Sequence, residues 1–156
     1  MNTPVVDTES PALVQVGESC ERSVRFTREE IATFARLTGD TNPLHHDVQA
    51  AQRARHGEII ASGQQTTAQM IGLVASHFSR SDDGQPRELL CLNFNFAFKA
   101  PVFAEQELVL HWQVASVEWS ASLGGWLVHA DGRATVRHAH PCVIGRGTLL
   151  VRAGRG

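Results

Sequence analysis

A predicted helix with almost no polar side, followed by a long run of strands, constrains the fold of this chain most. Residues 64–78 form the longest helical pattern in the sequence. Its apolar residues are Ala68, Met70, Ile71, Leu73, Val74, Ala75 and Phe78. A helix that is apolar most of the way round must be buried on most sides. The rest of the chain therefore has to cover this helix.

The residues that follow the loop 79–87 alternate between apolar and polar side chains. The clearest alternation runs from Leu90 to Phe98 and places Leu90, Leu92, Phe94, Phe96 and Phe98 on one face. We predict strands over 90–98, 108–119, 126–130, 134–139 and 142–152, with breaks at Asp131-Gly132 and near Pro141. One buried helix followed by long antiparallel strands predicts an α+β fold, with an antiparallel sheet wrapped around a long central helix.

The chain length favours a single domain. Its 156 residues are enough to bury a substantial core. Residues 1–10 are polar and without periodicity, so we expect a flexible N-terminal tail, with one domain over residues 11–156. Short extended pieces are expected over 12–16 and 22–26, around a turn at Gly17.

Charge and cysteine content exclude several classes of function. A net charge of −2 supplies no basic excess to neutralise nucleic-acid phosphates. No apolar stretch approaches the length that crosses a membrane, and the N-terminus lacks a secretory signal. Cys20, Cys91 and Cys142 are odd in number and widely spaced, which is typical of reduced thiols. We therefore expect a cytoplasmic protein that binds neither nucleic acid nor membranes.

A second predicted helix begins with unusually complete start signals. Thr27 can cap the free amides, and Glu30 completes a capping box. Phe26 and Ile31 form the matching hydrophobic staple. The apolar face of this helix would consist of Ile31, Phe34, Ala35 and Leu37. This helix ends at the loop that contains most of the candidate catalytic residues.

That loop, residues 38–47, contains several side chains that can donate or accept protons. Gly39 can close the helix in a left-handed conformation, and Pro43 prevents the helix from continuing. We expect a short rigid loop in which Asp40, Asn42 and His45 face a common point. A carboxylate and an imidazole held in this way form an acid–base pair suited to adding or removing water.

Simpler interpretations of the same loop exist. Asp40 could only form an Asx-type turn, and His45 could be a surface histidine. The amide of Asn42 could bind substrate or brace the loop backbone. His46 is expected to point away, and Asp47 is expected to cap a short helix over 48–55.

The run Gly39-Asp40-Thr41-Asn42-Pro43-Leu44-His45 resembles the Gly-Asp-x-Asn-Pro-x-His signature of the MaoC-like dehydratases, or (R)-specific enoyl-CoA hydratases. The resemblance implies a hot-dog fold and a hydro-lyase that needs no cofactor. Its reaction would reversibly hydrate trans-2-enoyl thioesters to (3R)-hydroxyacyl thioesters. In that reaction His45 would move a proton to or from the α-carbon or the water, while Asp40 holds and activates the water.

Ser62 and Gly63 precede the buried helix and are candidate substrate-binding residues. Hydration of an enoyl thioester develops negative charge on the thioester oxygen, which the free amides of a helix N-terminus can stabilise. Gly63 allows a ligand to approach its backbone closely. Ser62 could also serve simply as the N-cap of the helix, and the two roles are compatible.

The resemblance also implies partners. The substrate would be a thioester of coenzyme A or of an acyl-carrier protein, and the chain would form a homodimer or a larger homo-oligomer, with the active site between protomers and an acyl tunnel along the buried helix. His138 and His140 could hold a metal from one strand, but no third ligand has suitable spacing, so we expect no metal site.

Two other functions remain open from the sequence. A hot-dog acyl-CoA thioesterase often carries a carboxylate on its central helix, whereas residues 64–78 contain neither Asp nor Glu. A non-catalytic acyl-thioester-binding subunit would be expected to have a broken Asp–His motif, and here the motif is intact. The acyl chain length, the identity of the thioester handle and the physiological direction have no signature in the sequence.

Overall fold

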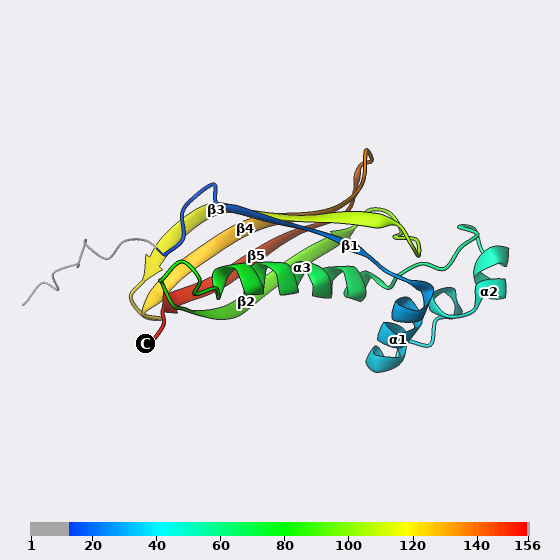
Figure 1. The fold of residues 1–156 in the computed structure, drawn as a ribbon, viewed down its shortest axis with the longest axis horizontal. Helices are drawn as coiled ribbons and strands as arrows, with labels where there is room; N and C mark the ends of the chain where they lie inside the picture. The colour runs from blue at the N-terminus through cyan, green and yellow to red at the C-terminus, as the bar shows by residue number, and fades with distance from the viewer. Residues whose placement is uncertain (1–12, 156) are drawn as a thin grey trace, which may run out of the picture.

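An antiparallel sheet of five strands lies along one side of a single long helix in the computed structural model, which describes residues 13–155. The sheet consists of β1 (Ser19–Arg25), β2 (Arg87–Phe98), β3 (Glu107–Ser120), β4 (Gly125–Val136) and β5 (Pro141–Ala153), in the order β1-β3-β4-β5-β2. Helix α3 (Gly63–Phe78) runs along the concave face (Figure 1). This α+β arrangement is the hot-dog fold expected from the sequence. The tail predicted over residues 1–10 lies outside the described residues.

Helix α3 is buried along the side that meets the sheet, and not on most sides as predicted: Ala68 is exposed and Ile71 is half-buried. Met70 and Val74 are fully buried, and Leu73 and Phe78 nearly so. The indole N–H of Trp112 on β3 donates a 2.8 Å hydrogen bond to the backbone carbonyl of Met70 in the middle of the helix. The helix is therefore fixed to the sheet by a polar contact as well as by apolar packing.

Glycines on the two central strands make room for aromatic rings from the strands that flank them. A Cβ on Gly132 of β4 would lie 2.6 Å from the Trp112 ring, and one on Gly145 of β5 would lie 2.5 Å from the Phe96 ring. Phe96 in turn packs edge-to-face against Trp112, with ring centroids 6.2 Å apart. Because the glycines have no side chains, the rings lie directly over the backbone of the sheet.

This packing corrects the predicted break at Asp131-Gly132. Strand β4 continues through both residues, paired with β3 and β5 throughout. Gly132 does not form a turn but leaves room for the Trp112 ring, which packs over its backbone. Asp131 forms an exposed ion pair with Arg146 of β5 at 3.4 Å. The real turn comes after Val136, so His138 lies in the β4–β5 connection, with a positive φ of 59°.

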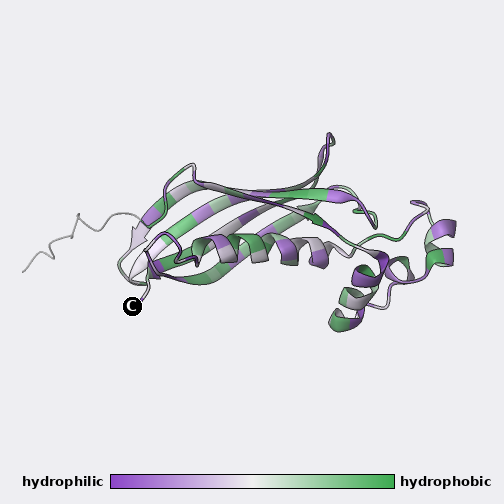
Figure 2. Cartoon of the chain, viewed as in Figure 1, coloured by the Kyte–Doolittle hydropathy of each residue, from purple (hydrophilic) through white to green (hydrophobic). Residues whose placement is uncertain are grey.

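The prediction of which β2 side chains face the core is only partly right. A bulge between Cys91 and Asn93 shifts the register, so the side chains before the bulge change faces. Phe94 and Phe96 pack on the core, together with Leu89. Leu90 and Leu92 are instead 51% and 47% exposed. Figure 2 shows hydrophobic and hydrophilic residues interleaved along the strands.

The N-terminal part of the domain differs from prediction at one strand. Residues 13–16 form bends and a turn instead of an extended piece. The predicted turn at Gly17 is present, with a positive φ of 86° and an amide that donates to the carbonyl of Val114. The extended piece predicted over 22–26 is the end of β1. The three cysteines are free thiols.

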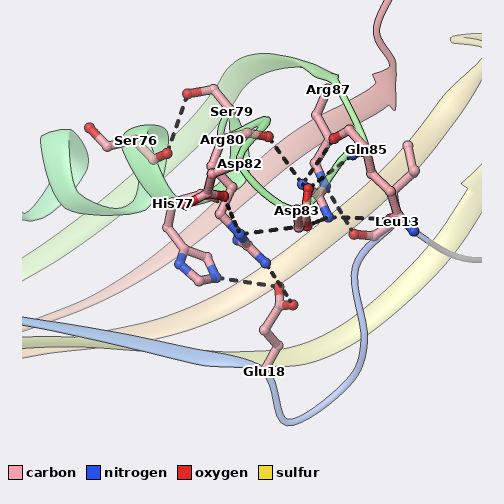
Figure 3. Close-up of polar contacts among 10 residues, drawn as sticks. All are labelled: Leu13, Glu18, Ser76, His77, Ser79, Arg80, Asp82, Asp83, Gln85 and Arg87. Atoms are coloured by element: carbon pink, nitrogen blue, oxygen red, sulfur yellow. Dashed lines mark hydrogen bonds and ion pairs between the residues drawn. The ribbon is translucent and has the colours of Figure 1, made fainter.

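The far end of α3 is tied to the loop that follows it by Arg87, whose side chain is 3% exposed (Figure 3). The guanidinium donates to the backbone carbonyls of Leu13, Arg80 and Gln85. It also makes a two-pronged pair with Asp83, with N–O distances of 3.1 and 2.7 Å. This network closes the end of the molecule opposite to α1 (Arg28–Thr38) and α2 (Val48–Arg53) (Figure 1).

We predict an acid-dependent loss of stability from this network. The hydrogen bonds from Arg87 and then from the Gln85 amide lower the pKa of Asp83 from 3.8 to about 2. The folded state therefore binds this proton less readily than the unfolded state, so the stabilisation is complete above pH 3.8 and is lost as the pH falls toward 2. Urea unfolding of the wild type and of Asp83→Asn should differ at pH 5 and converge toward pH 2. A difference that stays constant over this range would contradict the prediction.

Candidate active site

The candidate site begins where α1 ends. The capping box of Thr27 and Glu30 starts α1 as predicted, and Gly39 ends it in the left-handed conformation with φ 69°. The α1 face is only partly as expected: Ile31 and Ala35 are buried, whereas Leu37 is 81% exposed. The helix overhangs the end of the sheet, so that fewer of its sides meet the core (Figure 1).

Asp40 and His45 face each other on the loop that follows. The Oδ2 atom of Asp40 lies 3.3 Å from Nε2 of His45, and the two side chains are 27% and 7% exposed. The other carboxylate oxygen, Oδ1, accepts a 2.9 Å hydrogen bond from the backbone amide of Asn42. Asp40 therefore forms the Asx-type turn and contacts the imidazole at the same time.

The orientation of the His45 ring is fixed from its other side. Nδ1 lies 2.7 Å from the backbone carbonyl of Ile60. Because a carbonyl oxygen only accepts, Nδ1 carries the proton, and Nε2 is left to exchange a proton with Asp40 or with a ligand. His45 is thus a buried histidine with a defined tautomer, and the interpretation as a surface histidine is wrong.

Asn42 braces the loop. Its Oδ1 accepts a 3.1 Å hydrogen bond from the backbone amide of Leu44 and caps the short 3₁₀ helix η1 (Pro43–His45). His46 is exposed and points to the backbone of Thr41. Asp47 caps α2 through the amide of Ala50, and this hydrogen bond lowers the pKa of Asp47. These residues hold the loop in shape around the pair of Asp40 and His45.

The segment 59–61 joins this loop to the N-terminus of α3. Its Ile60 amide donates to the carbonyl of Leu44, and the neighbouring Ala61 amide donates to the carbonyl of Val102. Ser62 follows as the N-cap of α3, with its Oγ accepting from the Gln65 amide at 3.4 Å. The predicted capping role of Ser62 is confirmed. The hydrogen bond between His45 and Ile60 therefore links Asp40 and His45 to the segment that leads into α3.

The first amides of α3 are available to a ligand. Within the described residues, no protein acceptor bonds the backbone amides of Gly63 and Gln64. A cavity of about 490 Å³ adjoins Gly63 and is lined by His56, Thr66, Phe98 and Lys99 among others. The Phe98 ring lies directly on Gly63, because a Cβ there would be 2.5 Å from the ring. This arrangement offers unpaired donors and the positive end of the helix dipole to an oxyanion.

Two contributors to this site have no signal in the sequence. The carbonyl of Ile60 orients His45, yet any residue at that position supplies a carbonyl. The contact of Phe98 with Gly63 joins residues far apart along the chain, and an alternating strand pattern gives no information about such a contact. As for a metal, residues 13–155 contain no group of three or more His, Cys, Asp or Glu side chains that could hold one. None of the helices in that range is both long and apolar enough to cross a membrane.

Comparisons with known proteins find a matching family model and several relatives. The family model described as "MaoC like domain" matches residues 12–122. The chain is 28% identical to the (R)-specific enoyl-CoA hydratase of Aeromonas caviae over 67% of this chain and 73% of that protein. It is 23% identical to a mitochondrial 3-hydroxyacyl-[acyl-carrier-protein] dehydratase of Solanum lycopersicum over 79% and 73% of the two chains.

The fold is likewise shared with solved structures. The structure of an (R)-hydratase from A. caviae involved in PHA biosynthesis superposes with a TM-score of 0.76 at 24% identity. The superposition covers 87% of this chain and 96% of the other. At this level of identity the likeness establishes the hot-dog fold.

Proposed function

Because the chain belongs to the MaoC-like dehydratase family, we propose that it is a hydro-lyase that reversibly adds water to trans-2-enoyl thioesters to give (3R)-hydroxyacyl thioesters. The observation that carries the proposal is the 3.3 Å contact between Asp40 Oδ2 and His45 Nε2, on a loop that is hydrogen-bonded to the segment leading into α3. An acid–base pair beside a set of unpaired amides is the combination that hydration of a conjugated thioester requires.

The amides of Gly63 and Gln64 would bind the thioester oxygen. As water adds to C3, negative charge moves from the double bond onto that oxygen. The unpaired amides and the dipole of α3 stabilise the charge where it develops, and they need little rearrangement to do so. The space left by the missing side chain of Gly63 is filled by the Phe98 ring, which would border the bound thioester.

Asp40 and His45 would then each handle one proton. Asp40 takes a proton from the water whose oxygen bonds to C3, and protonated His45 gives a proton to C2. Asp40 ends the step protonated and His45 neutral, so that proton transfer across their contact restores the starting state. The Ile60 carbonyl keeps Nδ1 protonated throughout, which confines the exchange to Nε2. Dehydration follows the same steps in reverse.

The test is a pair of assays on one sample. Loss of enoyl-thioester absorbance is followed with crotonyl-CoA and with a longer trans-2-enoyl-CoA, while release of free thiol is measured in parallel. We expect absorbance to fall without thiol release. Thiol release would instead support a thioesterase, and retention of substrate in both assays would support a non-catalytic acyl-thioester-binding subunit.

We further propose that the active form is a homodimer or a larger homo-oligomer built on the edge strand β2. The two edges of the sheet differ in character: β1 exposes charged side chains such as Glu21 and Arg22, whereas β2 exposes Leu90 and Leu92. An exposed apolar edge strand is a surface that native proteins usually cover. A second copy of the chain would cover it and would also enclose the exposed Phe98 beside Gly63.

Leu92→Lys is expected to shift the protein from dimer to monomer. Leu92 is the unpaired residue of the β2 bulge, so a lysine there adds a charge to the proposed interface without breaking a hydrogen bond of the sheet. Sedimentation at micromolar concentration should give half the wild-type mass. Ser23→Lys, on the opposite edge strand, serves as the matched control and should leave the mass unchanged. A wild-type monomer under the same conditions would contradict the proposal.

A further inference from the structure

The first turn of α3 contains buried polar side-chain atoms that have no hydrogen-bond partner. Oε1 of Gln65 and Oγ1 of Thr66 are buried and have no hydrogen-bond partner in the protein. The two residues are 6% and 1% exposed. Thr66 lies three residues after Gly63, on the same face of α3, and lines the same cavity. Gln65 faces another side of the helix.

Neither side chain is needed to begin or stabilise the helix. Ser62 already caps α3, and Thr67, the neighbouring threonine, satisfies its own hydroxyl on the carbonyl of Gln64. Leaving a buried polar atom unpaired is unfavourable, and methionine and valine would fill the same volumes without that penalty. Buried unpaired groups of this kind point to a partner outside the polypeptide.

Each of the two side chains lines a cavity that a ligand could fill. Gln65 lies on a cavity of about 800 Å³ between α1 and α3, whose apolar wall contains Val24, Phe34 and Leu37. Thr66 lies on the cavity of about 490 Å³ that also contains Gly63. The terminal amide of Gln65 and the hydroxyl of Thr66 can each donate and accept, so both suit a hydroxyl or carbonyl oxygen.

The position of Thr66 decides which part of a substrate it would meet. Residue 66 lies about 4.5 Å along the helix axis from Gly63. A thioester oxygen on the Gly63 amide, with the acyl group directed along α3, would place the carbons just beyond the double bond beside Thr66. Hydrocarbon at that point would leave the hydroxyl of Thr66 unpaired in the bound state as well.

We propose that the natural acyl group is polar close to the thioester and carries a hydroxyl or carbonyl oxygen that Thr66 binds. This inference rests on the proposed hydratase function and narrows its substrate class from acyl thioesters in general to oxygen-bearing ones. A site built to hydrogen-bond a substrate group discriminates strongly against the analogue that lacks it. Thr66, which shares the cavity of Gly63, is accordingly a specificity-determining residue and takes no part in the proton transfers.

The experiment compares trans-2-hexenoyl-CoA with its 5-hydroxy derivative, which have the same chain length. We expect the wild type to hydrate the hydroxylated compound with a kcat/KM at least about tenfold higher. Thr66→Val should lose this preference, mainly through a higher KM for the hydroxylated compound. Its melting temperature should equal or exceed that of the wild type. Thr67→Val makes the same change one residue further along α3, where the hydroxyl already bonds the Gln64 carbonyl, so it is the control and should retain the preference.

The possible failures are distinguishable. Equal kcat/KM for the two compounds in the wild type, or an unchanged preference in Thr66→Val, overturns this inference and leaves the hydratase function in place. A wild type that hydrates neither compound nor crotonyl-CoA overturns the proposed function and this inference with it.

Discussion

Asp40→Asn is expected to lower kcat for enoyl-thioester hydration by about 10²- to 10⁴-fold, the range associated with loss of a positioned acid or base. The asparagine side chain keeps an oxygen that can accept the Asn42 amide, so the turn after α1 should persist. What changes is the atom that faces His45: an amide nitrogen replaces Oδ2 and cannot take a proton from water. The free energy of unfolding should therefore remain close to that of the wild type.

The measurement is the steady-state rate with crotonyl-CoA, alongside urea unfolding of the same samples. Asp47→Asn is the matched control, because it makes the same chemical change on the same loop. Asp47 caps α2 and does not contact the acid–base pair, and asparagine caps helices as well as aspartate does. Full activity in Asp40→Asn would remove Asp40 from the mechanism. A comparable loss of activity in Asp47→Asn would attribute the effect to the loop as a whole.

Trp112→Ala is expected to have the opposite profile, with a loss of about 3–5 kcal/mol in the free energy of unfolding. Trp112 is 1% exposed and packs against the rings of Phe94 and Phe96. Its indole N–H is also the donor to the Met70 carbonyl of α3. Truncation leaves a cavity over Gly132, where the sheet has no side chain to fill the space.

Trp112→Phe separates the two contributions. Phenylalanine retains most of the packing and loses the indole donor, so we expect a smaller loss of about 1–3 kcal/mol. Urea unfolding of both variants at neutral pH measures these differences. A loss below 1 kcal/mol in Trp112→Ala would show that the contact between helix and sheet is not a main source of stability. Activity measured below the unfolding transition should fall far less than in Asp40→Asn.

Much of the local structure could be predicted from the residues alone. The capping box at Thr27, the left-handed Gly39 and the N-cap Ser62 lie where the sequence placed them. Each of these features depends on backbone sterics and on hydrogen bonds that span a few residues, which a short stretch of sequence specifies. The same reasoning brought Asp40 and His45 onto one loop.

The expectations that were wrong depended on distant parts of the chain. A glycine after an aspartate usually marks a turn, yet Gly132 lies within β4 because the Trp112 ring needs the space. Leu90 and Leu92 appeared to belong to the core face, but the β2 bulge turns them outward. A shift of one residue in register reverses every side chain beyond it, and only the pairing with β5 sets that register.

The sequence by itself determined that Asp40 and His45 share one loop, where the caps of the helices lie and that α3 has an apolar face, since all three follow from short-range sterics and apolar periodicity. Only the tertiary structure decided how these parts meet. It placed the Ile60 carbonyl on His45, the Phe98 ring on Gly63 and the unpaired side chains of Gln65 and Thr66 beside cavities. Contacts between segments far apart in the chain depend on packing and register, which no local pattern encodes.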